Sequence, residues 1–436
     1  MLNLSRYESY KESEVPDLGE IPAHWKVIRN RFLFREQNER SLDGKETHLC
    51  MSQKFGLVPS DGFEDKTLQS ESYEGARLCL KGDLVLNRLK AHLSVFSTAP
   101  CEGLVSPDYS VFRLRDPEMI PKYFEYLFKT PVYLSEFNRR VRGIVVGFYR
   151  LYSGDFNDVR AICPPIEDQQ RIVEFLDRKT SEIDQAIAQK QRLIELLQEQ
   201  KAILINQAVT QGLNSNAPMR DSGIGWIGEI PTYWKRIKLK HCIDLLPGFA
   251  FKSSSYSTNN EDIPLLRGIN INLGIIRWDD IVYWFQNKLN GFSKYLLEEN
   301  DIVIGMDRPW ISSGIRVAKI TSQDLPCLLL QRVARIRAIK PLTQNYLELI
   351  LNSDGFRAYF EPMLTGISVP HISPDQIKNF EFFIPNEAEQ NSICNFVQKV
   401  YEDFEIVLKH ELEGIQALEE FKTVLTAEAI TGKLKV

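Results

Sequence analysis

The segments that come closest to catalytic motifs each lack a required residue. A phosphate-binding loop needs a glycine directly before its lysine, and the run Gly-Phe-Ala-Phe-Lys-Ser at 248–253 has none there. The run Cys-Pro-Pro-Ile at 163–166 lacks the polar and aromatic residues that hold a flipped adenine. A metal-nuclease pattern would have to join Asp108 to Asp177 and Lys179 across a long gap, which indicates a chance match. We therefore expect no catalytic residues and no nuclease, methyltransferase or ATPase chemistry in this chain.

Histidine and cysteine give no metal site either. The six histidines are dispersed, and the seven cysteines include no Cys-x-x-Cys pair. An odd number of separated cysteines favours reduced thiols in a cytoplasmic protein over a disulfide framework or a zinc site. No apolar run reaches the length of a membrane span, and the first twenty residues lack a signal-peptide core, so we expect no membrane contact.

An internal repeat is the most informative feature of the chain. The octapeptide GEIPAHWK at 19–26 returns as GEIPTYWK at 228–235. Three further pairs of segments repeat at a similar offset: 82–86 with 300–304, 165–170 with 385–390, and 197–213 with 418–434. Because the offset is about half the chain, the repeat predicts two domain-sized copies and not a solenoid of short units.

Each copy has the same expected order of elements. Strand-like runs separated by Gly, Pro and Asp turns come first, and a helix-rich segment follows at 123–137 and at 346–360. A proline-containing boundary then opens a long helix with acidic residues in its first turn. We predict an α+β fold with tandem domains at 1–165 and 214–385 and helical segments at 166–213 and 386–436. The polar run 214–225 is typical of a flexible linker.

The two long helices carry a matched coiled-coil pattern, because apolar positions recur every three and four residues in both. In the first helix this seam is Leu176, Thr180, Ile183, Ile187, Lys190, Ile194, Leu197, Lys201, Leu204 and Ala208. In the second it is Val397, Tyr401, Phe404, Leu408, Glu411, Ile415, Leu418, Lys422, Leu425 and Ala429. Separate packing of each helix on its own domain would need no matched frame, so the pattern favours a mutual coiled coil.

The seam also predicts an orientation. Two copies in one chain close most simply about a pseudo-two-fold axis, which makes the helices antiparallel. Pairing the helix centres then places Lys190 against Glu411, the seam position at which the copies carry opposite charges. The same register places Lys201 near Tyr401, and Lys422 near the threonine at 180.

The net charge of −5 is distributed unevenly. The helical segments 166–213 and 386–436 carry −2 and −5, and the arm 1–20 carries −3, which leaves the two globular stretches at about +5. A mild positive excess permits nucleic-acid binding without requiring it, since many enzymes have the same balance.

Taken in order, these motifs resemble the specificity subunits of type I restriction-modification systems over essentially the whole chain. The resemblance rests on the repeated octapeptide, the helix openings at 165 and 385, a strand at 104–109, and the segments 264–271 and 304–307. It implies a non-catalytic subunit with two target-recognition domains, each reading half of a split double-stranded DNA site. It further implies two adenine-N6 methyltransferase subunits on the helices, with restriction subunits in the larger complex. S-adenosylmethionine, ATP and magnesium would belong to those partners.

DNA contacts require cations for phosphates and planar polar groups for base edges. Candidates in the first domain are Lys54, Arg77, Arg88, Lys90, Arg139, Arg140, Arg142, Tyr149 and Arg150. Candidates in the second are Lys252, Arg267, Arg308, Trp310, Arg316 and His371. For Trp310 and His371, buried packing is favoured over DNA contact, and the repeated Trp25 and Trp234 are assigned to the core. The segments 143–147 and 366–370 are candidate DNA-facing loops.

Two other functions stay open at this point. One is a protein-only coiled-coil scaffold, which salt-dependent retention of duplex DNA would exclude. The other is an orphan specificity subunit that serves a modification-only or phage-defence system. The target bases themselves cannot be deduced, because recognition loops follow no simple code.

Overall fold

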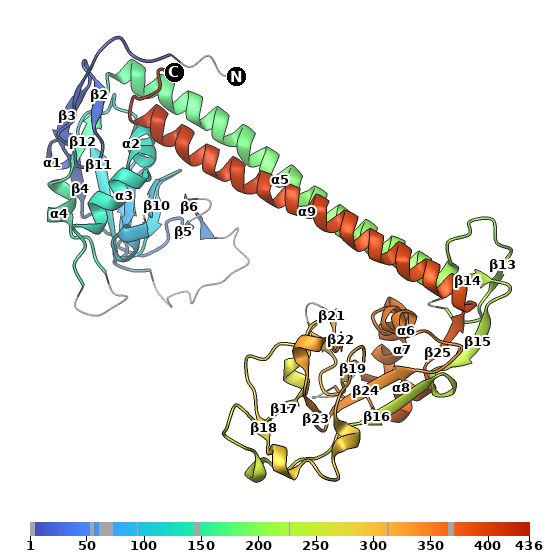
Figure 1. Ribbon diagram of the computed structural model, residues 1–436. Helices are drawn as coiled ribbons and strands as arrows, with labels where there is room; N and C mark the ends of the chain where they lie inside the picture. Colours follow the sequence, from blue (N-terminus) through green and yellow to red (C-terminus); the bar gives the residue numbers. More distant parts are fainter. Residues whose placement is uncertain are drawn as a thin grey trace. The chain divides into compact units, whose positions relative to one another are not determined.

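The computed structural model describes residues 5–52, 56–60, 73–93, 95–143, 149–225, 227–311, 314–364 and 370–436 (Figure 1). The chain forms two compact units, one of residues 1–192 with 411–436 and one of residues 193–410. Each unit holds one lobe of strands and short helices together with parts of two long helices. We call residues 5–165 the first lobe and 212–386 the second lobe. No helix in the described ranges combines the length and apolar character needed to cross a membrane.

The first lobe is built on an antiparallel four-stranded sheet. Its strand order is β4 (Phe34–Gln37), β11 (Tyr109–Leu114), β8 (Leu84–Asn87) and β9 (Phe96–Thr98). The helices α2 (Pro121–Phe128) and α3 (Pro131–Asn138) bury their aromatic faces in the same core as these strands. That core is rich in edge-on and stacked phenylalanine rings, whose pairs add to the burial of apolar surface.

The second lobe repeats this sheet. The strand order is β16 (Ile243–Pro247), β24 (Val333–Ala338), β19 (Ile302–Gly305) and β22 (Val317–Lys319), again antiparallel throughout. The helices α6 (Gln344–Leu351) and α7 (Asp354–Leu364) take the places of α2 and α3. The predicted mixture of helix and sheet is confirmed, and the same strand order in each lobe accounts for the repeat in the sequence.

A pair of short strands opens each lobe. β1 (Tyr10–Glu12) pairs with β2 (Glu20–Pro22), and β13 (Met219–Asp221) pairs with β14 (Glu229–Pro231). The expectation of a flexible linker at 214–225 is therefore wrong. Its polar composition belongs to an edge strand, and the side chains of Ala217 and Ser222 are buried.

A second small sheet closes each lobe just before its long helix. β3 (Lys26–Arg29) pairs with β12 (Arg160–Cys163), and β15 (Lys235–Lys238) pairs with β25 (Glu381–Ile384). Each strand that follows the repeated octapeptide is thereby tied to the strand that leads into a long helix.

The remaining α-helices and strands are short. In the first lobe they are α1 (Asn30–Leu33), β5 (Leu49–Ser52), β6 (Gly56–Pro59), β7 (Arg77–Cys79), β10 (Gly103–Val105) and α4 (Ser153–Asn157). In the second they are β17 (Ile263–Leu266), β18 (Tyr283–Trp284), β20 (Trp310–Ile311), β21 (Gly314–Ile315), β23 (Leu328–Leu329) and α8 (Pro374–Asn379). The expected single strand at 104–109 is wrong, because β10 ends at Val105 and β11 begins at Tyr109.

The long helices are α5 (Ile166–Gln211) and α9 (Glu387–Ile430). Acidic residues occupy the first turn of each, where they offset the positive end of the helix dipole. Every position of the predicted seam is buried or half-buried except Tyr401, which is 38% exposed.

Contacts between α5 and α9 occur within each unit. In the first unit Lys190 Nζ donates to Glu411 Oε2 at 2.7 Å, and Lys422 Nζ donates to Asp184 at 2.6 Å. The α9 numbers rise as the α5 numbers fall, so these segments are antiparallel. In the second unit Lys201 Nζ lies 4.1 Å from the ring centroid of Tyr401. Lys422, expected near the threonine at 180, pairs one turn further along α5.

Candidate nucleic-acid interface

The repeated tryptophan fastens the start of a long helix in each lobe. Trp25 and Trp234 are buried, which confirms their assignment to the core. Trp25 Nε1 donates to Asp168 Oδ2 at 3.1 Å, and Trp234 Nε1 donates to Glu389 Oε1 at 3.3 Å. Both carboxylates lie in the first turn of a long helix. The repeated octapeptide thus supplies the same indole donor to both anchors.

The carboxylate of Asp168 has further hydrogen-bond partners. His24 Nε2 lies 2.9 Å from Asp168 Oδ2, and Arg171 also donates to this carboxylate. Burial raises the pKa of Asp168, but the bonds from His24, Arg171 and Trp25 outweigh burial and hold the pKa below its usual value. Tyr233 occupies the position of His24 in the second copy of the octapeptide. Its hydroxyl donates to Glu389 at 3.1 Å.

A buried glutamine follows each of these carboxylates. Gln169 Oε1 accepts from the backbone N–H of Ile120 at 3.0 Å, directly before α2. Gln390 Oε1 accepts from the backbone N–H of Thr343 at 2.9 Å, directly before α6. Because both glutamines are fully buried, each bond satisfies groups that could not otherwise reach water.

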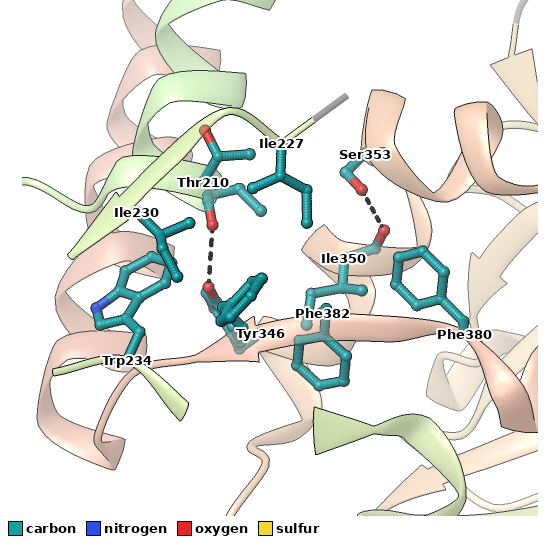
Figure 2. A pocket seen from close by; sticks show the side chains of 12 residues that line it. Thr210, Ile227, Ile230, Trp234, Tyr346, Ile350, Ser353, Phe380 and Phe382 are labelled. Carbon is teal, nitrogen blue, oxygen red and sulfur yellow. Dashed lines mark hydrogen bonds between the residues drawn. The ribbon is translucent and has the colours of Figure 1, made fainter. Parts of the chain in front are cut away.

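A buried tyrosine in each lobe binds the C-terminal end of a long helix, and this is not the helix whose start the same lobe binds. Tyr123 Oη in α2 donates to the carbonyl of Ile430 at the end of α9, at 3.1 Å. Tyr346 Oη in α6 donates to the carbonyl of Val209 near the end of α5, at 3.3 Å, and Figure 2 shows this bond beside Trp234. Each lobe therefore binds the start of one long helix and the end of the other.

Figure 2 also shows a small cavity beside Tyr346. It has a volume of about 30 Å³ and a mostly apolar lining that includes Ile230, Ile350 and Phe382. This volume suits about one water molecule and is far below that of a small-molecule site. The cavity is a packing gap at the end of α5.

A buried aspartate braces the central strands of each sheet. Asp83 accepts two bonds from Arg113, both 2.8 Å, and Asp301 accepts a matching pair from Arg337. Each aspartate precedes β8 or β19, and each arginine lies on the neighbouring strand. Two-bond pairs of this kind fix the strands relative to one another.

Three segments meet at the end of the first lobe's sheet and form a charged junction of Arg88, Asp108 and Arg150. Arg150 Nη2 donates to Asp108 Oδ1 at 2.8 Å, and Arg88 Nη2 lies 3.8 Å from the same oxygen. Arg88 also donates to the backbone carbonyls of Pro107 and Asp108. Burial and the nearby charges of Arg77 and Arg150 lower the pKa of Arg88.

The second lobe has a charged junction in the same place, made of Asp307, Arg332 and His371. His371 Nδ1 lies 2.6 Å from Asp307 Oδ1, and Arg332 donates to Asp307 Oδ2. Burial raises the pKa of Asp307, but the bonds from Arg332 and His371 outweigh it and lower the pKa.

The backbone fixes the equivalence of the two junctions. In the first lobe the N–H of Leu151 donates to the carbonyl of Arg88 at 3.1 Å. In the second the N–H of Ile372 donates to the carbonyl of Met306 at 2.9 Å. Arg150 and His371 therefore hold the same position, directly before these N–H donors.

The other DNA-binding candidates of the first lobe differ in burial and in their partners. Arg77 is buried and bonded to Glu36 and to the carbonyl of Gln37, an environment unlike that of an exposed DNA contact. Lys90 and Tyr149 are exposed. Arg139, Arg140 and Arg142 pair with carboxylates other than Asp108, and the backbone of Arg142 exchanges two hydrogen bonds with that of Arg150. Lys54 and most of the loop 143–147 lie outside the described residues.

The second-lobe candidates are also scattered. Lys252 and Arg308 are exposed, Arg267 pairs with Asp280, and Arg316 donates to the carbonyl of Gly268. Trp310 is half-buried against the core, with its ring centroid 5.8 Å from that of Phe360. The buried role favoured for His371 is wrong, because its side chain is 48% exposed. The loop 366–370 lies outside the described residues except for Pro370.

The sequence-based search missed Asp108, Asp307 and Arg332. It sought cations, whereas the carboxylates are what hold the cations in place. Their position was a partial signal, because Asp108 and Arg332 each directly precede an equivalent strand, β11 or β24, but it does not indicate which side chains they contact. Among the described residues, no group of three or more His, Cys, Asp and Glu side chains is arranged to hold a metal ion.

Comparison with known proteins identifies relatives. The family model for the type I restriction modification DNA specificity domain matches residues 231–416. The MjaVIII specificity subunit of a type I restriction enzyme from Methanocaldococcus jannaschii is 27% identical over 282 residues, covering 64% of this chain and 63% of that subunit. The EcoAI specificity subunit from Escherichia coli is 33% identical over 204 residues, covering 47% of this chain and 34% of that subunit. The alignments span less than two thirds of either relative.

The similarity in fold extends over nearly the whole chain. A solved chain from a study of complex assembly and conformational transition in the type I R-M system superposes with a TM-score of 0.69 at 15% identity. The superposition covers 95% of this chain and 99% of that one. At this identity the match establishes the fold.

Proposed function

We propose that this chain is a specificity subunit of a type I restriction-modification system, the non-catalytic subunit that directs such an enzyme to its DNA sequence. Each lobe binds one half of a bipartite target in double-stranded DNA. The observation that carries this proposal is the duplication of the lobe. The same strand order, the same tryptophan anchor and a charged junction at the same place in the sheet occur twice in one chain.

The long helices have two roles in this proposal. As a paired antiparallel coiled coil they set the separation of the half-sites, since each lobe grips the start of one helix and the end of the other. They also bind the methyltransferase subunits. S-adenosylmethionine, ATP and magnesium belong to those partners and to the restriction subunits.

Exposed apolar side chains on the helices support methyltransferase binding. Ile203 and Leu196 on α5 are 48% and 45% exposed, and Val424 and Phe421 on α9 are 53% and 48% exposed. Ile203 and Val424 occupy equivalent positions in the repeat. Apolar surface of this kind marks a protein interface, and its recurrence at equivalent positions favours two copies of one partner.

The test is to sequence methylated DNA from cells that make this chain together with its methyltransferase. We expect one bipartite motif with an unread spacer. Replacing residues 1–165 with the same lobe of a relative should change one half of the motif and leave the other. A swap that altered both halves, or a methylated motif without a spacer, would contradict the proposal. Retention of duplex DNA that weakens with salt separates this function from a protein-only scaffold.

A further inference from the structure

The charged junctions carry a further inference, which rests on the proposed function. We propose that Arg150 in the first lobe and Arg332 in the second are specificity-determining residues, each reading a guanine in its own half-site. Asp108 and Asp307 are positioning residues that hold these arginines.

The two lobes serve as controls for each other. Where they share a structural need they keep the residue type, as in the aspartate–arginine brace, the buried glutamine, the tryptophan and the tyrosine. At the charged junction the side chains change while the arrangement stays. A carboxylate joins two basic side chains in both lobes, two arginines in the first and an arginine and a histidine in the second, but Asp108 precedes β11 whereas Asp307 follows β19. Two readers of one fold with different targets should differ in this way at their reading positions.

The arginine side chains of the junctions also have donors suited to base recognition. The side chain of Arg332 is 67% exposed and that of Arg150 is 35% exposed. Among the described residues, Asp108 is the side chain that accepts a hydrogen bond from Arg150, and Asp307 is the one that accepts from Arg332. Each guanidinium thus keeps further N–H donors for a ligand. Guanine presents two acceptors, O6 and N7, in the major groove, and a forked arginine donor matches them.

Backbone geometry separates Arg332 from an ordinary surface arginine. Its φ of 67° lies in the left-handed region, which is costly for a residue with a Cβ. The Met306 N–H donates to its carbonyl at 2.9 Å and helps to hold this conformation. The side chain of Arg88, by contrast, is only 18% exposed and donates to the backbone carbonyls of Pro107 and Asp108. We therefore assign Arg88 a structural role in the first junction and not a contact with a base.

A phosphate contact is the competing role, and lysine distinguishes the two. A phosphate is satisfied by a positive charge, whereas O6 and N7 of guanine are matched better by the rigid fork of arginine than by the single ammonium of lysine. We would make Arg150→Lys and Arg332→Lys in the full chain, each in complex with the methyltransferase. Arg35→Lys and Arg357→Lys are matched controls, because both arginines are exposed and lie outside the junctions. Each complex is read out by sequencing its methylated sites.

The unmodified complex should methylate a motif with at least one G·C pair in each half. Arg150→Lys should relax one such pair in one half by about tenfold or more, and Arg332→Lys should relax one in the other half. The controls should leave the motif unchanged. Asp108→Asn and Asp307→Asn should relax the same base pairs. If a lysine variant fails to assemble, these asparagine variants test the inference in its place.

Three results would overturn the inference. They are a half-site without a G·C pair, lysine variants with unchanged base preference, and a uniform loss of methylation without relaxed specificity. None of these results affects the proposed function, which depends only on the unmodified complex having a bipartite motif. A motif that is not bipartite would refute the proposed function itself.

Discussion

Lys190 Nζ donates to Glu411 Oε2 at 2.7 Å and joins the middle of α5 to the middle of α9 within the first unit. Lys190 also fills the space beside Gly414, where an added Cβ would lie 3.1 Å from its Nζ. The glycine costs the helix about 1 kcal/mol relative to alanine, and it leaves room for the lysine. This pair is the one that the symmetric antiparallel register places together.

The first prediction concerns this pair. Lys190→Glu should place two carboxylates side by side and lower the free energy of unfolding by about 1–2 kcal/mol, between the values for exposed and buried pairs. The change is measured by thermal unfolding at low salt. The double variant Lys190→Glu with Glu411→Lys should recover most of the loss, and a double variant no more stable than the single would contradict the pairing.

The second prediction concerns Asp168. Its pKa is lower in the folded chain than in the unfolded chain, so the folded state is stabilised wherever the carboxylate is ionised in both. That stabilisation is full above about pH 5 and is lost as the pH falls through the folded-state pKa. Asp168→Asn should therefore lower stability at neutral pH by about 1–3 kcal/mol and flatten the acid side of the stability curve.

A neighbouring residue gives the control for Asp168. Glu167 lies in the same helical turn but is exposed. Glu167→Gln should leave both the stability at neutral pH and its acid dependence nearly unchanged. Equal effects of the two substitutions would mean that the helix dipole alone accounts for Asp168.

The third prediction concerns the apolar positions on the helices. Ile203→Glu and Val424→Glu each put a charge on one of two equivalent exposed sites, so each should remove one methyltransferase subunit from the complex. The mass of the complex measures this directly, and the double variant should bind none. Gln198→Glu is the control, because it adds the same charge to an exposed position on the opposite flank of α5. Loss of both subunits from a single variant would show that the sites are not separate.

The sequence could predict those features that repeat or follow a helical period. The matched frame of the seam and its one position of opposite charge suffice to propose the contact between Lys190 and Glu411. The recurrence of Trp25 suffices to assign it to the core. The linker prediction failed because polar composition was given more weight than the repeat, which already implied a strand at 219–221 like the one at 10–12.

The charged junctions could not be predicted in the same way. Arg88, Asp108 and Arg150 come from three separate segments, and no local pattern indicates that they meet. The sequence likewise does not show which charged side chains are exposed to solvent. Arg77 resembles any other cation, but Glu36 neutralises it inside the lobe. Buried charges are tolerated where they are paired, and such partners are known only once the fold is known.

The last prediction tests the long helices as a ruler for the half-sites. In an antiparallel pair an insertion keeps the register only if both helices are lengthened at the same level. The contact of Lys201 with Tyr401 places Leu197 at the level of Phe404, so one heptad is inserted after each. A heptad adds roughly 10 Å, or about three base pairs at about 3.4 Å each. The bases read by each lobe should persist while the unread spacer grows by up to about three base pairs.

Affinity is a poor measure of this change, because the lengthened chain meets the duplex at a new rotational phase. Sequencing of methylated sites gives the spacer directly. A heptad placed after Leu197 alone is the control, since it breaks the register with α9 and should destabilise the complex without defining a new spacer. Half-sites that changed while the old spacer persisted would show that α5 and α9 do not set the distance. So would an unchanged spacer in an active complex.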